Sequence, residues 1–199
     1  NLYKYFNGEA LLKDVNATIE DNDRIGLIGR NGCGKSTLLK IITGMENFDK
    51  TNDGKGSVNI SNNITVGFLQ QNSGLDNMCT IGEEMKKPFA DLLEILEKMK
   101  DYEQKMPLVK GEEFDKLSSE YAELCSYYEA RDGYNINVKI NTVLNGMGFG
   151  DKGRDRIIHS LSGGEKTRLA MAKLLLEEPK LLILDEPTNH LDFETLMWL

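Results

Sequence analysis

Residues 29–37, with the sequence GRNGCGKST, hold the residue types that bind the phosphates of a nucleotide. They fit the pattern G-x-x-x-x-G-K-[ST], with Gly29, Gly34, Lys35 and Ser36 at its fixed positions. Glycines let backbone N–H groups surround phosphate oxygens, and the start of the following helix adds its positive dipole end. We expect the Lys35 ammonium to reach the β- and γ-phosphates and the Ser36 hydroxyl to bind Mg²⁺.

Two adjacent carboxylates, Asp185 and Glu186, follow the apolar run Leu181–Leu184. This run is expected to form a fully buried strand that delivers both acids to the mouth of the phosphate site. Asp185 would hold Mg²⁺, directly or through water, and Glu186 would orient or deprotonate an attacking water. The sequence therefore predicts a nucleotide hydrolase.

An α/β core must position these residues. Apolar residues alternate over residues 13–19, which predicts a half-buried strand, and the run RIGLI at 24–28 predicts a short buried strand that leads into the phosphate loop. An apolar helical stretch follows the loop. Residues 57–60 and 64–69 predict two strands around a turn.

An all-helical segment interrupts this core. Apolar residues recur at helical spacing from Phe89 to Met106, and from Phe114 to Tyr128 they keep the three-then-four spacing of a coiled-coil seam. Pro107 and Gly111 lie between the two sets and break helices, so the pattern predicts two antiparallel helices in a hairpin. A third helix is expected over about residues 136–147, and the core resumes at Leu161.

Composition limits the class of protein. A chain of 199 residues with 40% hydrophobic residues can bury a core, and its net charge of −8 argues against a general nucleic-acid-binding surface. No apolar run approaches the roughly 20 residues that span a bilayer, and no signal-peptide pattern opens the chain. The three cysteines, Cys33, Cys79 and Cys125, form no CxxC pair. A reducing, cytoplasmic location fits these features.

A third motif, LSGGEK at residues 161–166, opens a predicted helix. Ser162 is a good N-cap, and Glu165 three residues later completes a capping box. The motif lies between the phosphate loop and the acid pair, and this ordered combination resembles the ABC-type ATPases, whose signature motif is LSGGQ. The resemblance covers nearly the whole chain. Glu165 departs from the family's glutamine, although acidic variants occur in the family.

The resemblance implies roles for the first site. Residues 29–37 look like the Walker A loop, in which Asn31, Gly32 and Thr37 join the residues named above as ligands of ATP. Asp185 ends a Walker B strand and Glu186 matches the catalytic glutamate. In VGFLQQN, Gln71 matches the glutamine that senses metal and water, with Gln70 as the alternative.

The resemblance also implies a second, shared site. Ser162, Gly163 and Gly164 would contact the γ-phosphate of ATP held by a different ABC domain, and residues 189–192 look like the D-loop. Phe6 matches the aromatic residue that stacks on adenine, although a plain packing role near the terminus is the alternative.

The form DEPTNHLD at residues 185–192 is typical of the ABC-F group, which has two ATPase domains in one chain and many ribosome-associated members. The predicted hairpin at about 89–131 matches the arm that this group inserts in its first domain. The resemblance thus implies a P-loop ABC ATPase core with a mixed sheet around the Walker A helix, ATP and Mg²⁺ as ligands, a second ABC domain in the full-length chain, and the ribosome as partner. The expected parts are the first part of the core at 1–71, a helical subdomain at 72–160, and the signature, Walker B and D-loop at 161–199.

Alternatives remain open at this point. Residues 86–131 hold 11 acids and 8 bases, a net charge of −3, so the hairpin could be a solvated subdomain without RNA contact, although its tip carries Lys105 and Lys110. The ATP-binding subunit of a membrane transporter is the competing function, and an ATP-dependent clamp with slow hydrolysis is a third.

The family's switch histidine is expected some tens of residues after the Walker B strand. Neither His159 nor His190 matches that position. We therefore expect residues 1–199 on their own to bind nucleotide weakly and to hydrolyse it poorly.

Overall fold

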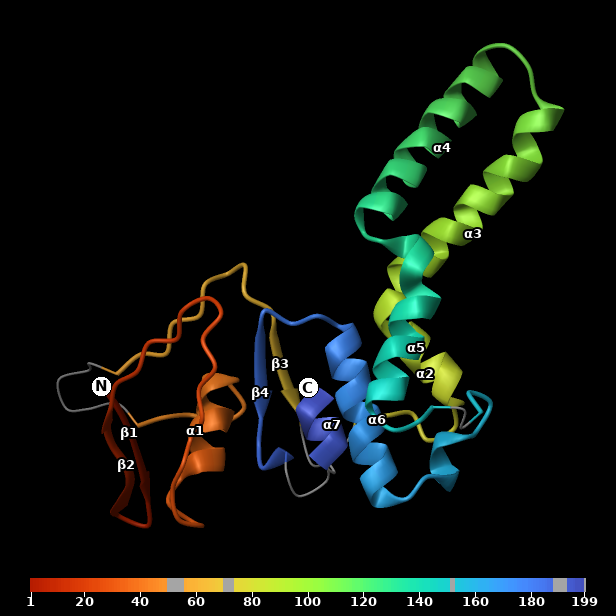
Figure 1. Ribbon diagram of the computed structural model, residues 1–199. Coiled ribbons are helices and arrows are strands. Elements are labelled where there is room, and N and C mark those ends of the chain that lie inside the picture. Colours follow the sequence, from red (N-terminus) through yellow and green to blue (C-terminus); the bar gives the residue numbers. More distant parts are fainter. Residues whose placement is uncertain (50–55, 70–73, 151–152, 188–192, 199) are drawn as a thin grey trace. The chain divides into compact units, whose positions relative to one another are not determined.

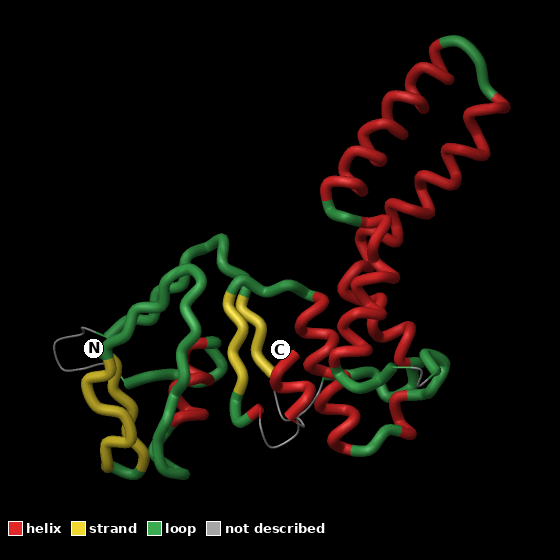
Figure 2. The backbone as a smooth tube through the Cα atoms, in the orientation of Figure 1, coloured by secondary structure: helices red, strands yellow, loops and turns green. Residues whose placement is uncertain are grey.

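A computed structural model describes residues 1–49, 56–69, 74–150, 153–187 and 193–198. The chain divides into two compact units. The first unit comprises residues 1–69 with 179–186, and the second comprises residues 70–178 with 187–199. Strands occur in the first unit and helices dominate the second (Figure 2).

The first unit opens with an antiparallel hairpin of β1 (Leu2–Phe6) and β2 (Glu9–Val15). Asn7 and Gly8 form its turn with φ values of 51° and 85°. Two residues with positive φ match the right-handed twist of paired strands, which is why Asn-Gly suits this position. The strand predicted over residues 13–19 is wrong in its bounds, since β2 ends at Val15.

Helix α1 (Lys35–Ile42) follows the glycine loop, and its Ile41 packs with Leu2 and Leu12 in the core of this unit. The strand predicted at residues 24–28 is absent, and Ile28 is 95% exposed. The apolar composition predicted burial, but burial requires neighbouring strands, and no described strand pairs with this run. The strand predicted at 57–60 is absent too.

A second pair of strands, β3 (Val66–Leu69) and β4 (Leu181–Leu184), is parallel and in register (Figure 1). Thr65 fixes the start of this pairing, because its carbonyl accepts a hydrogen bond from Leu181 N (3.0 Å). The β4 strand was expected to be fully buried, but within it only Ile183 is buried, since among the described strands it has a partner on one side only.

The second unit is helical, as the apolar spacing predicted. Its helices are α2 (Ile81–Lys86), α3 (Ala90–Lys105), α4 (Glu112–Ala130), α5 (Ile136–Gly146), α6 (Gly163–Leu176) and α7 (Phe193–Trp198). Short 3-10 turns lie at Lys87–Phe89, Met106–Leu108, Gly133–Asn135 and Ile158–Ser160.

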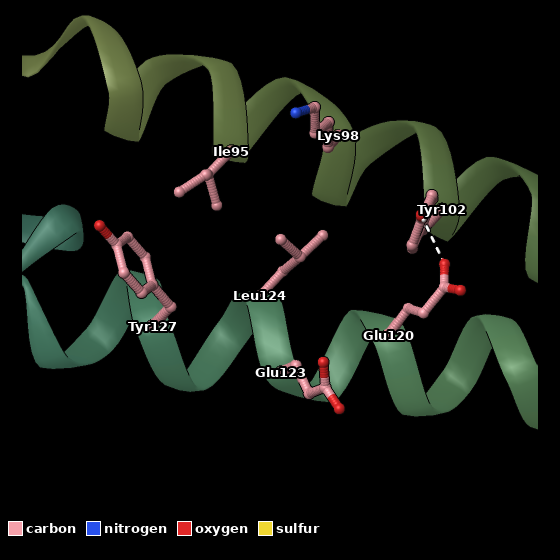
Figure 3. A pocket seen from close by; sticks show the side chains of 7 residues that line it. All are labelled: Ile95, Lys98, Tyr102, Glu120, Glu123, Leu124 and Tyr127. Carbon is pink, nitrogen blue, oxygen red and sulfur yellow. Dashed lines mark hydrogen bonds between the residues drawn. The ribbon is translucent and has the colours of Figure 1, made fainter.

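Helices α3 and α4 form the predicted hairpin, which stands out from α2, α5 and α6 of the same unit (Figure 1). Two reciprocal hydrogen bonds cross between the helices: Tyr102 donates to Glu120 (2.8 Å) and Tyr121 donates to Glu103 (2.6 Å). In the groove between the helices, Ile95 and Leu124 point toward one another (Figure 3). The hairpin therefore combines a narrow apolar seam with polar links along its length.

The core of the second unit lies where α2, α5 and α6 meet. Its largest fully buried apolar side chains come from these helices and from the segments that follow α5: Ile81, Met85, Ile140, Met147, Phe149, Ile158, Leu169 and Met171. At the end of α5, the indole of Trp198 from α7 covers Gly146 so closely that a side chain there would overlap the ring. Among the described helices, none is both long enough and apolar enough to span a membrane.

Candidate nucleotide-binding site

The glycine loop owes its shape to two residues in left-handed conformations. Gly32 has a φ of +79° and Gly34 has a φ of +96°. A Cβ on Gly34 would also lie 2.9 Å from Leu12 Cδ2 and 3.0 Å from Leu11 Cγ, both on β2. Gly34 is thus required twice, for its backbone conformation and for its close approach to the hairpin.

The first turn of α1 has free backbone donors. Its N-cap, Gly34, has no side chain that could cap the helix, and the first turn carries no acidic residue. The first hydrogen bond within the helix runs from Leu38 N to Gly34 O (2.9 Å). The N–H groups of Lys35, Ser36 and Thr37 therefore have no partner within the helix, and they present the positive end of its dipole to an anion.

The ammonium of Lys35 lies over the beginning of the loop. It donates hydrogen bonds to the carbonyl oxygens of Gly29 (2.9 Å) and Arg30 (3.1 Å). The loop itself turns through a bond from Cys33 N to Arg30 O (3.3 Å). One positive side chain and a set of uncapped N–H groups thus belong to a single stretch of nine residues, which is the donor set that a polyphosphate needs.

The acidic pair follows β4 directly. Asp185 is half-buried and Glu186 is exposed, with a φ of +48°. Glutamate in this left-handed region is strained by about 1–3 kcal/mol, and Glu178, which lies outside the site, has the same conformation. Carboxylate and hydroxyl oxygens are the ligands that Mg²⁺ prefers, so Asp185 and Ser36 fit a magnesium site by their chemistry.

Residues 12–189 match the family described as ABC transporter. The chain belongs to this family. It is 41% identical over 198 residues to the putative ATP-binding protein YdiF of Bacillus subtilis, and this match covers 100% of the chain and 30% of YdiF. It is 35% identical over 189 residues to the energy-dependent translational throttle protein EttA of Escherichia coli, covering 95% of the chain and 33% of EttA.

The chain therefore spans about a third of the length of the curated relatives it matches. Solved structures agree on the fold. A dimeric bacterial ABC transporter cassette aligns with a TM-score of 0.59 at 22% identity, covering 100% of this chain and 77% of that one. The structure of cbiO1 from Clostridium perfringens aligns with a TM-score of 0.54 at 23% identity. This match covers 98% of this chain and 67% of cbiO1. The chain is an ABC ATPase domain with the mixed α/β cassette fold, and members of its family bind ATP, normally with Mg²⁺, and hydrolyse it.

The ABC signature motif is well formed. Ser162 Oγ accepts a hydrogen bond from Glu165 N (3.3 Å), while Ser162 N donates to Glu165 Oε2 (2.9 Å), so the predicted capping box is confirmed. A Cβ on Gly163 or on Gly164 would meet no atom within 4 Å, and neither residue has a positive φ. Packing within the described part of the chain gives no reason for glycine at these two positions.

The structure places the predicted ABC site residues in two units. Phe6, the Walker A loop at 29–37 and the acidic pair lie in the first unit, and the signature lies in the second. Phe6 is 49% exposed, and the Lys4 ammonium lies 5.1 Å from its ring centroid. Within the described part of the chain, no hydrogen bond joins the loop to Asp185.

Two of the predicted site elements cannot be compared with the structure, and two features of the structure were not predicted. Gln71, its alternative Gln70, and the D-loop at 189–192 lie outside the described residues. A second capping box, in which Thr80 Oγ1 accepts a hydrogen bond from Glu83 N (3.2 Å), was not predicted, although the spacing Thr-x-x-Glu indicates it. The fully buried Glu84 was not predicted either, because no local sequence pattern indicates it.

Proposed function

We propose that this chain is the first ATPase domain of a cytoplasmic ABC-F protein that acts on the ribosome. It would bind and hydrolyse MgATP at a head-to-tail interface with a second ABC domain of the same full-length chain. One observation carries the ABC-F assignment: a long helical hairpin, α3 and α4, is inserted between the Walker A loop and the signature. Relatives support it, because ABC transporter F family member 5 of Arabidopsis thaliana is 35% identical over 204 residues.

The nucleotide site would be built from the first unit. The N–H groups at the start of α1, with Asn31 and Gly32 in the loop, would receive the phosphates, and Lys35 would neutralise their charge. Ser36 and Asp185, with Gln71, would hold Mg²⁺, which supplies charge neutralisation at the transferred phosphate. Glu186 would orient the attacking water, and Phe6, exposed at the end of β1, would offer its ring to adenine.

The signature would serve the opposite domain. Gly163 and Gly164 open α6, and among the described residues no tertiary neighbour lies within 4 Å of a Cβ added to either one. Glycine allows another group to approach the backbone closely. Since no described residue of this chain does so here, we expect the approaching group to come from another molecule or domain. The γ-phosphate of ATP in the second ABC domain is the partner that we propose for Ser162, Gly163 and Gly164.

The ribosome contact is proposed for the hairpin tip. Leu108 at the tip is 83% exposed, and Lys105 and Lys110 flank the turn. The remainder of the hairpin is acidic, so phosphate contacts would be confined to this end. The relative that supports this proposal is EttA, which is described as an energy-dependent translational throttle protein.

The test uses the full-length protein with Glu186 and its counterpart in the second domain both changed to Gln. Loss of the water-orienting carboxylate should keep ATP bound between the domains, so the protein should co-sediment with ribosomes in ATP and remain in the supernatant in ADP. Adding Lys35→Met should abolish the ATP-dependent fraction. Absence of ribosome binding in both nucleotides would refute the ABC-F proposal.

The ATP-binding subunit of a membrane transporter is the second candidate function. The support for it is that the chain is 37% identical over 194 residues to YfmM of Bacillus subtilis, which is described as an ABC transporter ATP-binding protein. Co-purification with a membrane protein, together with no ribosome binding, would favour it. A clamp with slow hydrolysis would bind ribosomes equally well, but ribosomes would leave its ATP turnover unchanged.

A further inference from the structure

A buried carboxylate lies beneath the signature helix. Glu84 of α2 is 0% exposed, yet it is charged and takes no part in the nucleotide chemistry proposed above. Its Oε1 accepts a hydrogen bond of 2.6 Å from Lys173 Nζ, which lies on α6. Lys87 Nζ lies 2.5 Å from Oε2 and forms an ion pair with it.

Glu84 is ionised at neutral pH. Burial by itself raises the pKa of this carboxyl, but the hydrogen bond from Lys173 and the contact with Lys87 outweigh burial and leave the pKa below its ordinary value. The side chains of Lys173 and Lys87 are 21% and 42% exposed, so both lysines keep contact with water. Their exposure means that removing the Glu84 charge would not leave an unhydrated cation behind.

The backbone around Glu84 is joined to the segment that leads into the signature. Ile81 N donates to Arg156 O (3.0 Å) and Gly82 N donates to Arg154 O (2.9 Å). In the other direction, Ile158 N donates to Cys79 O (3.0 Å). A Cβ on Gly82 would lie 3.3 Å from the Arg154 side chain, so the two segments are in close contact.

Two side-chain contacts then hold α6 itself. Near its start, Arg156 Nη1 lies 3.4 Å from Glu165 Oε1, and the other oxygen of Glu165 caps the helix. Near its end, Lys173 is bound by Glu84. Residues 165 and 173 are eight positions apart, which is about 12 Å along a helix. Two fixed points at this separation define the direction of the helix as well as its position.

We propose that Glu84 is a positioning residue for ATP hydrolysis: by binding Lys173 it fixes the signature helix so that Ser162, Gly163 and Gly164 face the ATP of the opposite domain. This inference rests on the proposed shared site. Buried ion pairs contribute little net stability compared with apolar side chains, but they can select one packing arrangement over others. Apolar side chains of α2 and α6 already pack in this core, and the short charged bond adds a directional contact that favours one register of the two helices.

The experiment compares Glu84→Gln with Glu94→Gln in the full-length protein. Glu94 forms an exposed pair with Lys98 (2.9 Å) on α3, so the same chemical change is made away from α6. We measure kcat for ATP, the affinity for a fluorescent ATP analogue in the absence of turnover, and the midpoint of thermal unfolding. Glu84→Gln should lower kcat about tenfold, because small displacements of positioning groups are costly, while nucleotide affinity changes less than twofold. Glu94→Gln should match the parent protein.

Variants of Lys173 test the same contact from its other side, and they keep the proposal testable if the Glu84→Gln variant does not fold. Lys173→Met should lower kcat to the same degree, Lys173→Arg should preserve most of it, and the Glu84→Gln/Lys173→Met double variant should be no worse than either single one. Equal kcat for Glu84→Gln and Glu94→Gln, or additive losses in the double variant, would overturn the positioning role while leaving the proposed ATPase intact. If the parent protein does not hydrolyse ATP, the proposed function fails, and the positioning role fails with it.

Discussion

The ammonium of Lys35 donates a hydrogen bond of 2.9 Å to the carbonyl oxygen of Gly29, six residues earlier in the chain. This bond, with a second one to Arg30 O, ties the start of α1 back to the start of the glycine loop. The lysine therefore has a structural partner as well as its proposed phosphate partner, and its loss would affect both the shape and the charge of the loop.

We expect Lys35→Met to weaken MgATP binding at least about tenfold, since a hydrogen bond to a charged group contributes roughly 1.5–3 kcal/mol. Titration with a fluorescent ATP analogue measures this directly. Lys40→Met is the matched control, because Lys40 lies on the same helix, is exposed, and is remote from the loop. Equal affinities for the two variants would contradict the assignment of the phosphate site.

Gly34→Ala tests the packing of the loop against β2. The added Cβ would lie within 2.9 Å of Leu12 on a residue with a φ of +96°, so both crowding and backbone strain act against it. The free energy of unfolding should fall by about 1–3 kcal/mol, measured by urea titration. Gly26→Ala should be nearly neutral, since that Cβ meets no atom within 4 Å. A neutral Gly34→Ala would show that β2 does not support the loop.

Alkaline pH should loosen the α3–α4 hairpin. The hydrogen bond to Glu120 raises the pKa of Tyr102 above its ordinary value of 10.0, and the bond to Glu103 does the same for Tyr121. A raised pKa in the folded state means that this stabilisation is complete below pH 10 and is lost as the pH rises through the folded-state values.

Circular dichroism during an alkaline titration would detect the loss of hairpin helix, and tyrosinate absorbance would report the ionisation itself. The Tyr102→Phe/Tyr121→Phe variant lacks both hydroxyl groups, so its helix signal should be less sensitive to alkaline pH than that of the parent protein. The same alkaline loss of helix in both proteins would mean that these two pairs do not set the pH response.

The tip lysines test the proposed ribosome contact. Lys105→Glu/Lys110→Glu should reduce ATP-dependent co-sedimentation with ribosomes several-fold, because phosphate binding depends on the few cations available there. Lys98→Glu/Lys100→Glu, an equal change of charge in the middle of α3, should have a smaller effect. If all variants bind equally, the tip makes no phosphate contact, and the ribosome would be bound through another surface.

Features that depend on neighbours in sequence were predictable. The phosphate loop, the capping box at Ser162 and the helices of the hairpin follow from local spacing, because caps and helix faces involve residues three or four positions apart. The Asn7–Gly8 turn carried an equally local signal, the Asn-Gly pair, and it could have been predicted.

Features that depend on distant partners were not predictable. The run RIGLI at 24–28 has the composition of a buried strand, but the residues that would cover Ile28 are supplied by other parts of a sheet, and its exposure could not be read from the run itself. Glu84 and Lys173 are 89 positions apart, and neither is unusual in its local sequence. Only the structure brings this carboxylate and this ammonium together.

The indole of Trp198 packs directly on Gly146, and this contact gives the chain a natural fluorescent probe. Trp198 is the one tryptophan among 199 residues, so all indole emission reports the surroundings of a single ring. Helix α7, which carries it, begins at Phe193, next to the residues that the resemblance assigns to the D-loop. Trp198 is already 43% exposed, and a nucleotide-driven shift of that segment that lifts the ring from α5 would expose the rest of the indole and move its emission further to longer wavelength, with no label attached.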